Sequence, residues 1–109
     1  MNNNTFQLSE PTVFADLNKK ETKEADYVRS ALPLNRLKYK HFRDVMKYPE
    51  ADQMHHLMLE MTGLSESDLG ELSPDDAAEI SSIIFEAMKK YIQLGQRILK
   101  GLEGPLVTN

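Results

Sequence analysis

The chain has 109 residues, 40% of them hydrophobic and 28% charged, and a formal net charge of −4, which fits one small domain and disfavours an extensive phosphate-binding surface. No cysteine is present, which excludes disulfides, thiolate metal sites and a cysteine nucleophile. Neither a secretory signal nor an apolar run of roughly 20 residues is visible, so we expect a cytoplasmic protein without membrane contact.

The N-terminal part has the pattern of a β-hairpin. Residues 1–5 are polar and rich in asparagine, and we expect them to be disordered. Good strand residues fill 6–15, and Pro11 among them predicts an edge strand or two short pieces. Residues 16–20 form a polar turn candidate, and the hairpin region extends to residue 30. The lysines, glutamates and alanine within 19–30 leave a helix there as the alternative.

Helices are predicted after a break at residues 32–34. Asn35 is a natural cap for a first helix at about 36–47, the most basic segment of the chain. A second helix is predicted from residue 51 or 52 to Thr62, and Gly63 is its expected C-terminal stop.

Two serines mark the next helix starts. Each stands three residues before an aspartate, as in a variant capping box: Ser65 before Asp68, and Ser73 before Asp76. The first predicts a single helical turn at 66–69, and the second a long amphipathic helix at 74–102, followed by a flexible tail at 103–109. Its expected core stripe consists of Ile80, Ile83, Ile84, Ala87, Met88, Tyr91, Leu94 and Ile98.

The predicted fold class is therefore α+β and mainly α. An N-terminal β-hairpin precedes a small helical bundle with a long C-terminal helix. Residues 6–102 form the expected single domain, with the hairpin region at 6–30 and the helical region at 35–102.

A second apolar stripe on the long helix is the main candidate site. Phe85, Ile92 and Leu99 lie seven residues apart and are displaced from the core stripe. Either the N-terminal strands cover this stripe, or it is a surface for a partner or for self-association. The second candidates for partner contact are Met54, Met58 and Met61.

No residue pattern predicts an enzyme, a cofactor or a metal. His41, His55 and His56 are the only histidines and do not have the spacing of a zinc site. Asp75 and Asp76 are explained by the positive end of a helix dipole rather than by acid–base catalysis. Glycine-rich phosphate loops and nucleophile elbows are absent from the sequence.

Two motifs resemble the small tail assembly chaperones of Mu-like and related tailed bacteriophages. The first is an L-x-x-P-x-x-F segment from Leu8 to Phe14, followed later by Val28-Arg29. The second is the block 57–88, where a leucine-rich helix is followed by Thr-Gly-Leu-Ser at 62–65. Further matches in that block are Asp68-Leu69, Leu72 and Asp75-Asp76.

The resemblance implies a non-enzymatic protein in the cytoplasm of a bacterial host. It would bind the tape measure protein, assist tail tube subunits in assembly, and be absent from the mature virion. One alternative is a small helical regulatory or nucleic-acid-binding domain that uses the basic segment 36–47, although nucleic acid is disfavoured by the acidic total. A homo-oligomeric structural protein of the virion is a third hypothesis.

Overall fold

The computed structural model describes the backbone of residues 4–107 and the side chains of residues 4–94. The elements in chain order are β1 (Thr5–Val13), α1 (Ala15–Lys20), β2 (Val28–Pro33), α2 (Tyr39–Val45), α3 (Glu50–Thr62), α4 (Glu66–Leu69) and α5 (Pro74–Val107). The protein is α+β and mainly α, as predicted. Within the described residues, no helix is both long enough and apolar enough to span a bilayer.

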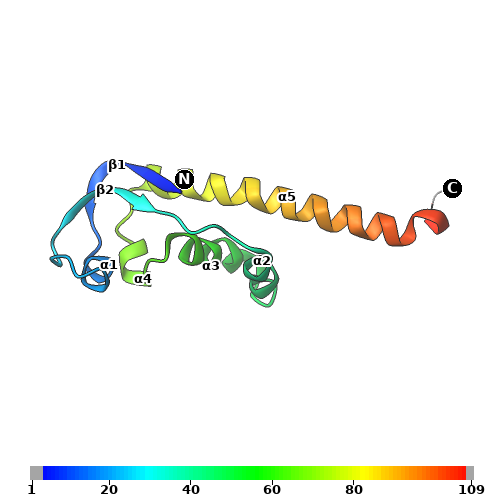
Figure 1. Ribbon diagram of the computed structural model, residues 1–109, viewed down its shortest axis with the longest axis horizontal. Coiled ribbons are helices and arrows are strands. Elements are labelled where there is room, and N and C mark those ends of the chain that lie inside the picture. Colours follow the sequence, from blue (N-terminus) through cyan, green and yellow to red (C-terminus); the bar gives the residue numbers. More distant parts are fainter. Residues whose placement is uncertain (1–3, 108–109) are drawn as a thin grey trace.

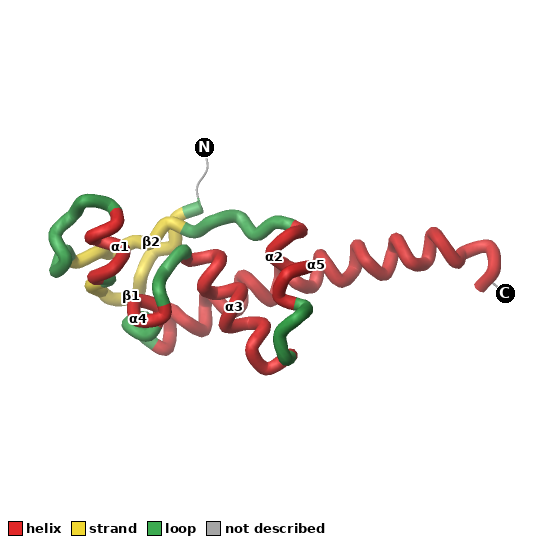
Figure 2. Tube along the Cα trace, turned by 90° about the horizontal axis from the view of Figure 1, so that it is seen from below, coloured by secondary structure: helices red, strands yellow, loops and turns green. Residues whose placement is uncertain are grey.

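The molecule is elongated because α5 is much longer than the body beside it. The principal extents are 62, 31 and 24 Å. Figure 1 shows the hairpin and α1 at the N-terminal end of α5, with α4, α3 and α2 following along its first half. The second half of α5 extends beyond the body, and Figure 2 shows the same projection from a perpendicular direction.

The hairpin consists of two antiparallel strands. Phe6 pairs with Leu32 and Val13 with Val28, and the register shifts between Gln7 and Thr12. That irregularity accommodates Pro11, which cannot donate a ladder hydrogen bond. Strand β1 is thus one continuous edge strand, and it begins at Thr5, a residue that the sequence placed in the disordered end.

Residues 16–20 were expected to form a turn, but they lie in helix α1. Leu17 and Asn18 are buried on it. Asp68, far along the chain, accepts the backbone N–H of Leu17 at 2.8 Å and so stabilises the helix start. Residues 19–30, for which strand and helix were both possible, contain the end of α1, a turn region and the first residues of β2.

Asn35 does not cap the basic helix, which begins only at Tyr39. Instead, Asn35 binds the C-terminal end of α3. Its backbone N–H donates to the Met61 carbonyl at 2.6 Å, and its Nδ2 donates to the Glu60 carbonyl at 3.1 Å. The free carbonyls of that helix end are satisfied in this way, which is why Asn35 lies there.

Helices α3, α4 and α5 begin close to the predicted positions. Gly63 ends α3 in the left-handed conformation, with a φ of 69°. Helix α5, however, continues past Gly101 to Val107 instead of ending near Leu102. A glycine lowers helix stability by only about 1 kcal/mol relative to alanine, so it does not by itself end a helix.

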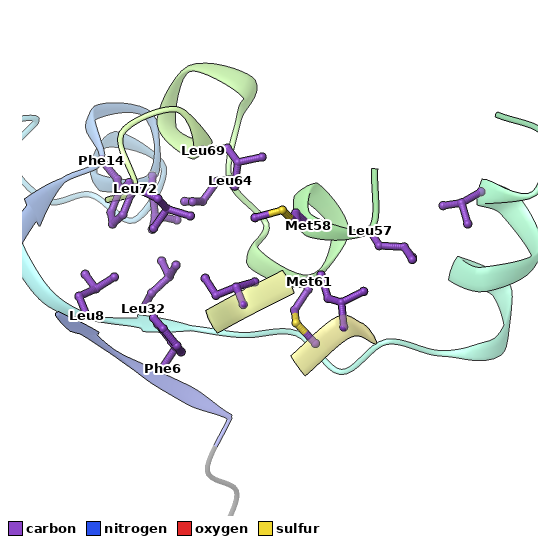
Figure 3. Close-up of a cluster of buried hydrophobic side chains, with 14 of the residues drawn as sticks. Phe6, Leu8, Phe14, Leu32, Leu57, Met58, Met61, Leu64, Leu69 and Leu72 are labelled. Carbon is purple, nitrogen blue, oxygen red and sulfur yellow. The ribbon is translucent and has the colours of Figure 1, made fainter. Parts of the chain in front are cut away.

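The hydrophobic core lies between the hairpin, α3 and the first half of α5. Figure 3 shows Phe6, Leu8 and Leu32 of the hairpin pointing toward this core. Among the described side chains, the apolar ones with no exposed surface are Phe14, Leu32, Leu57, Ile80 and Ile84. Two residues of the predicted core stripe, Ile83 and Leu94, are instead 39% and 48% exposed, because the body covers only a narrow face of α5 and only its first half.

Candidate partner-binding surface

Helices α4 and α5 are each fixed to the N-terminal segment by a capping motif at their first turn. Ser65 and Ser73 each accept the backbone N–H of the aspartate three residues later, both at 3.1 Å. These aspartates are almost fully buried, with exposed fractions of 2% for Asp68 and 1% for Asp76. Asp76 accepts the backbone N–H of Ser9 with both carboxylate oxygens, at 2.9 and 3.1 Å. The serines therefore cap their own helices, while the aspartates fix β1 and α1 in place.

An aromatic cluster marks the point where α5 leaves the body. The rings of Phe42 and Tyr91 are stacked with their centroids 4.9 Å apart, and Tyr39 lies 6.0 Å from Tyr91. These contacts fasten α2 to the middle of α5. Beyond Tyr91 the helix extends away from the other elements in both views (Figures 1 and 2).

Phe85 and Ile92 lie on an exposed flank of α5. Their exposed fractions are 56% and 49%, so the hairpin does not cover them. The Lys89 ammonium lies over the ring of Phe85, 5.9 Å from its centroid, which is within reach of a cation–π interaction. Leu99, the third residue of the stripe, is part of α5, but its side chain lies outside the described residues. The described part of the stripe is an apolar surface with a cation beside it.

The second candidate group lies in the core rather than on the surface. Met58 and Met61 are only 9% and 7% exposed, and Met54 is half-buried against the same core. The Ser81 hydroxyl donates to the Met58 sulfur at 3.5 Å. These methionines face α5 and the hairpin because they occupy the apolar side of α3, so they do not form an open surface.

The basic segment forms a separate, exposed surface. Arg36, Lys38 and Lys40 line a hollow of about 290 Å³ together with His41 and Glu60. Arg43 is paired with Asp44 at 3.3 Å and lies over the ring of Tyr39. Cations of this segment are thus gathered beside the linker that precedes α2.

The histidines occur in separate polar contacts. His55 Nε2 lies 2.9 Å from Glu66 Oε1, and the ring of His56 stacks on Tyr48. His41 Nδ1 accepts the backbone N–H of Lys38 at 2.8 Å. Among the residues that the structure describes, no three histidine, aspartate or glutamate side chains are grouped closely enough to hold a metal ion.

A buried polar network in the hairpin was not foreseen from the sequence. Asn18 is fully buried, and its Nδ2 donates to the carbonyl of Tyr27 at 2.8 Å. Arg29 donates from Nε to Asn18 Oδ1 at 2.7 Å and pairs with Glu21 at 2.6 Å. The Val28-Arg29 motif was a visible signal, but nothing in its neighbourhood indicated which side chains Arg29 would bind.

No family model matches the chain, and no curated protein or solved structure matches it either. Function is therefore inferred from the chain's own residues. Two surfaces of the described residues bear on the proposed function: the Phe85 and Ile92 stripe of α5 and the basic segment before and within α2.

Proposed function

We propose that the protein is a phage or prophage tail assembly chaperone that binds an apolar helix of the tape measure protein. The observation that carries the proposal is the exposed stripe of Phe85 and Ile92 on a helix that extends beyond its own body. Large apolar side chains repeated every seven residues are the pattern with which one helix binds another.

Two further features support a binding role. The stripe lies on a long, regular helix that is anchored to the body by Tyr91 and Phe42, so a partner would meet a surface that is already ordered. Lys89 beside the stripe favours a partner helix with an acidic residue next to its apolar face. The motif resemblance in residues 8–14 and 57–88 then suggests the tape measure protein as that partner, with tail tube subunits recruited afterwards.

The test is a pull-down with a tape measure protein of a Mu-like tailed phage as the captured partner. The double variant Phe85→Asp with Ile92→Asp should lose most of the captured partner, because two charges then lie in the apolar contact. The matched control is Val28→Asp with Met46→Asp, since both residues are at least as exposed as Ile92, at 54% and 65%, and lie off α5. Equal capture by both double variants would refute the surface.

The basic segment supports a second candidate function. The hollow lined by Arg36, Lys38 and Lys40 could receive phosphate groups of a nucleic acid. Binding of labelled DNA that weakens steeply with salt and is lost in the double variant Arg36→Ala with Lys40→Ala would favour this function.

A structural role in the virion makes a different prediction. Mass spectrometry should then find the protein in purified phage particles, whereas a chaperone that stays in the host cytoplasm should be absent from them.

A further inference from the structure

The buried face of α5 has an exposed flank on each side. One flank carries the stripe of Phe85 and Ile92, and the other carries a second row of exposed residues. Its described members are Glu79, Ile83, Glu86, Lys90 and Leu94, and all five are exposed. At about 100° per residue, they fall within about 80° of one another around the helix, and the row lies about 150° from Phe85 and Ile92. The row is therefore separate from the proposed partner stripe.

The order of side chains in this row is self-complementary. From N- to C-terminus it reads acidic, apolar, acidic, basic, apolar. Arg97, whose side chain lies outside the described residues, follows at the same spacing in the sequence. Reversing the row exchanges acidic for basic residues and leaves the apolar residues in equivalent places. Glu86 thus corresponds to Lys90, Ile83 to Leu94, and Glu79 to Arg97.

We propose that this row binds the same row of a second copy of the chain in antiparallel orientation. The two-fold axis crosses between the two helices at the level of residue 88, so each acidic residue of one copy meets a basic residue of the other. Ile83 of one copy packs on Leu94 of its partner at both ends of the central charge pairs. In a parallel pair each residue would face the same residue of the other copy, so like charges would lie next to each other. This repulsion favours the antiparallel pair.

The surroundings of the row leave it accessible to a second helix. Ile83 and Ala87 form one wall of a hollow of about 420 Å³ whose other walls include Phe6 and Leu37. Glu86 pairs with Lys89 of its own copy at 3.6 Å, but its side chain remains 64% exposed and open to a further cation. Leu94 lies beyond the aromatic cluster at Tyr91, where α5 projects from the body.

This pairing concerns a different surface from the proposed function and does not depend on it. The contact from residue 79 to residue 97 is about 27 Å long. That is short for a permanent dimer, so we expect a reversible one whose population rises with protein concentration. In the dimer, the stripes of Phe85 and Ile92 stay open on both copies.

Sedimentation equilibrium with charge-exchanged variants tests the pairing. The wild type should approach twice the 12.5 kDa mass of one chain as concentration rises. Glu79→Arg with Glu86→Lys makes the row wholly basic, and Lys90→Glu with Arg97→Glu makes it wholly acidic, so each variant alone should be monomeric. An equimolar mixture should restore the dimer. A monomeric wild type, a mixture that stays monomeric, or single variants that still dimerise would each overturn the proposal.

Cysteine cross-linking reports the orientation independently of charge. The natural chain has no cysteine, so each introduced thiol is unique. Oxidation of Ile83→Cys mixed with Leu94→Cys should give mostly the mixed disulfide, because these positions face each other across an antiparallel pair. Preferential coupling of Ile83→Cys with itself would indicate a parallel pair and contradict the proposal. The variant Phe85→Asp with Ile92→Asp should cross-link as before, which separates this surface from the partner stripe.

Discussion

The carboxylate of Asp76, in the first turn of α5, accepts the backbone N–H of Ser9, near the middle of β1, with both of its oxygens. A residue that the sequence explained by the helix dipole and by a capping box with Ser73 therefore also fixes the hairpin to the helix.

Replacing Asp76 with alanine should destabilise the protein by about 1–3 kcal/mol, since the Ser9 N–H loses its acceptor in a partly buried place. Asp75→Ala is the matched control. It removes the same charge from the same helix turn, but at an exposed position, and should cost only about 0.3–1 kcal/mol. Urea unfolding followed by circular dichroism measures both. Equal losses would mean that the dipole, and not the contact with Ser9, accounts for Asp76.

Arg29→Ala should destabilise the hairpin by about 1–3 kcal/mol. The substitution leaves Oδ1 of the fully buried Asn18 without its donor. Arg29→Lys should recover little, because a lysine ammonium cannot reproduce the two directed bonds of the guanidinium. Arg36→Ala, at an exposed position, should stay within about 0.5 kcal/mol of wild type. Thermal unfolding of the three variants tests this ranking, and a harmless Arg29→Ala would contradict it.

The two glycines near α4 should respond oppositely to alanine. Gly63 has a φ of 69°, and an added Cβ would lie 3.3 Å from Asn35 Nδ2, so Gly63→Ala should cost about 1 kcal/mol. Gly70 has a φ of −65°, and an added Cβ would lie 3.4 Å from the Ser67 carbonyl oxygen, an ordinary van der Waals distance. Gly70→Ala should therefore be neutral or stabilise by about 0.4–1 kcal/mol. Denaturation midpoints of the two variants measure these effects. If both midpoints move in the same direction, the prediction is wrong.

Exposure on α5 separates residues that look alike in the sequence. Ile84 has no exposed surface, whereas Ile92 is 49% exposed. Truncation of Ile84 to alanine should cost about 2–5 kcal/mol, and that of Ile92 less than about 0.5 kcal/mol. Chemical denaturation distinguishes them, and a large loss from Ile92→Ala would show that the stripe is covered within one chain.

Local signals located the helices well. Ser65, Ser73 and Gly63 act on backbone groups within a few residues, so their patterns predicted the bounds of α3, α4 and the start of α5. Helix α1 and the role of Asn35 could not be predicted in this way. Their partners, Asp68 and the end of α3, lie 51 and 25 residues away in the chain.

The candidate site was predicted only in part. The seven-residue spacing identified Phe85 and Ile92, but whether the hairpin covered them depended on its packing direction, which the sequence does not contain. The same spacing rules placed Ile83 and Leu94 in the core, because periodicity does not indicate how much of a helix face its neighbours reach.

The contacts of Asp68 and Asp76 also constrain the order of folding, since they join residues 51 and 67 positions apart. An isolated two-stranded hairpin is marginally stable, and contacts between distant residues form slowly. We therefore expect pulsed hydrogen exchange to protect the amides of α3 and α5 before those of β1 and β2, and early protection of the strands would exclude this order. During synthesis, the hairpin is made before α5 and would then acquire its final structure only after the first turn of α5 has been made.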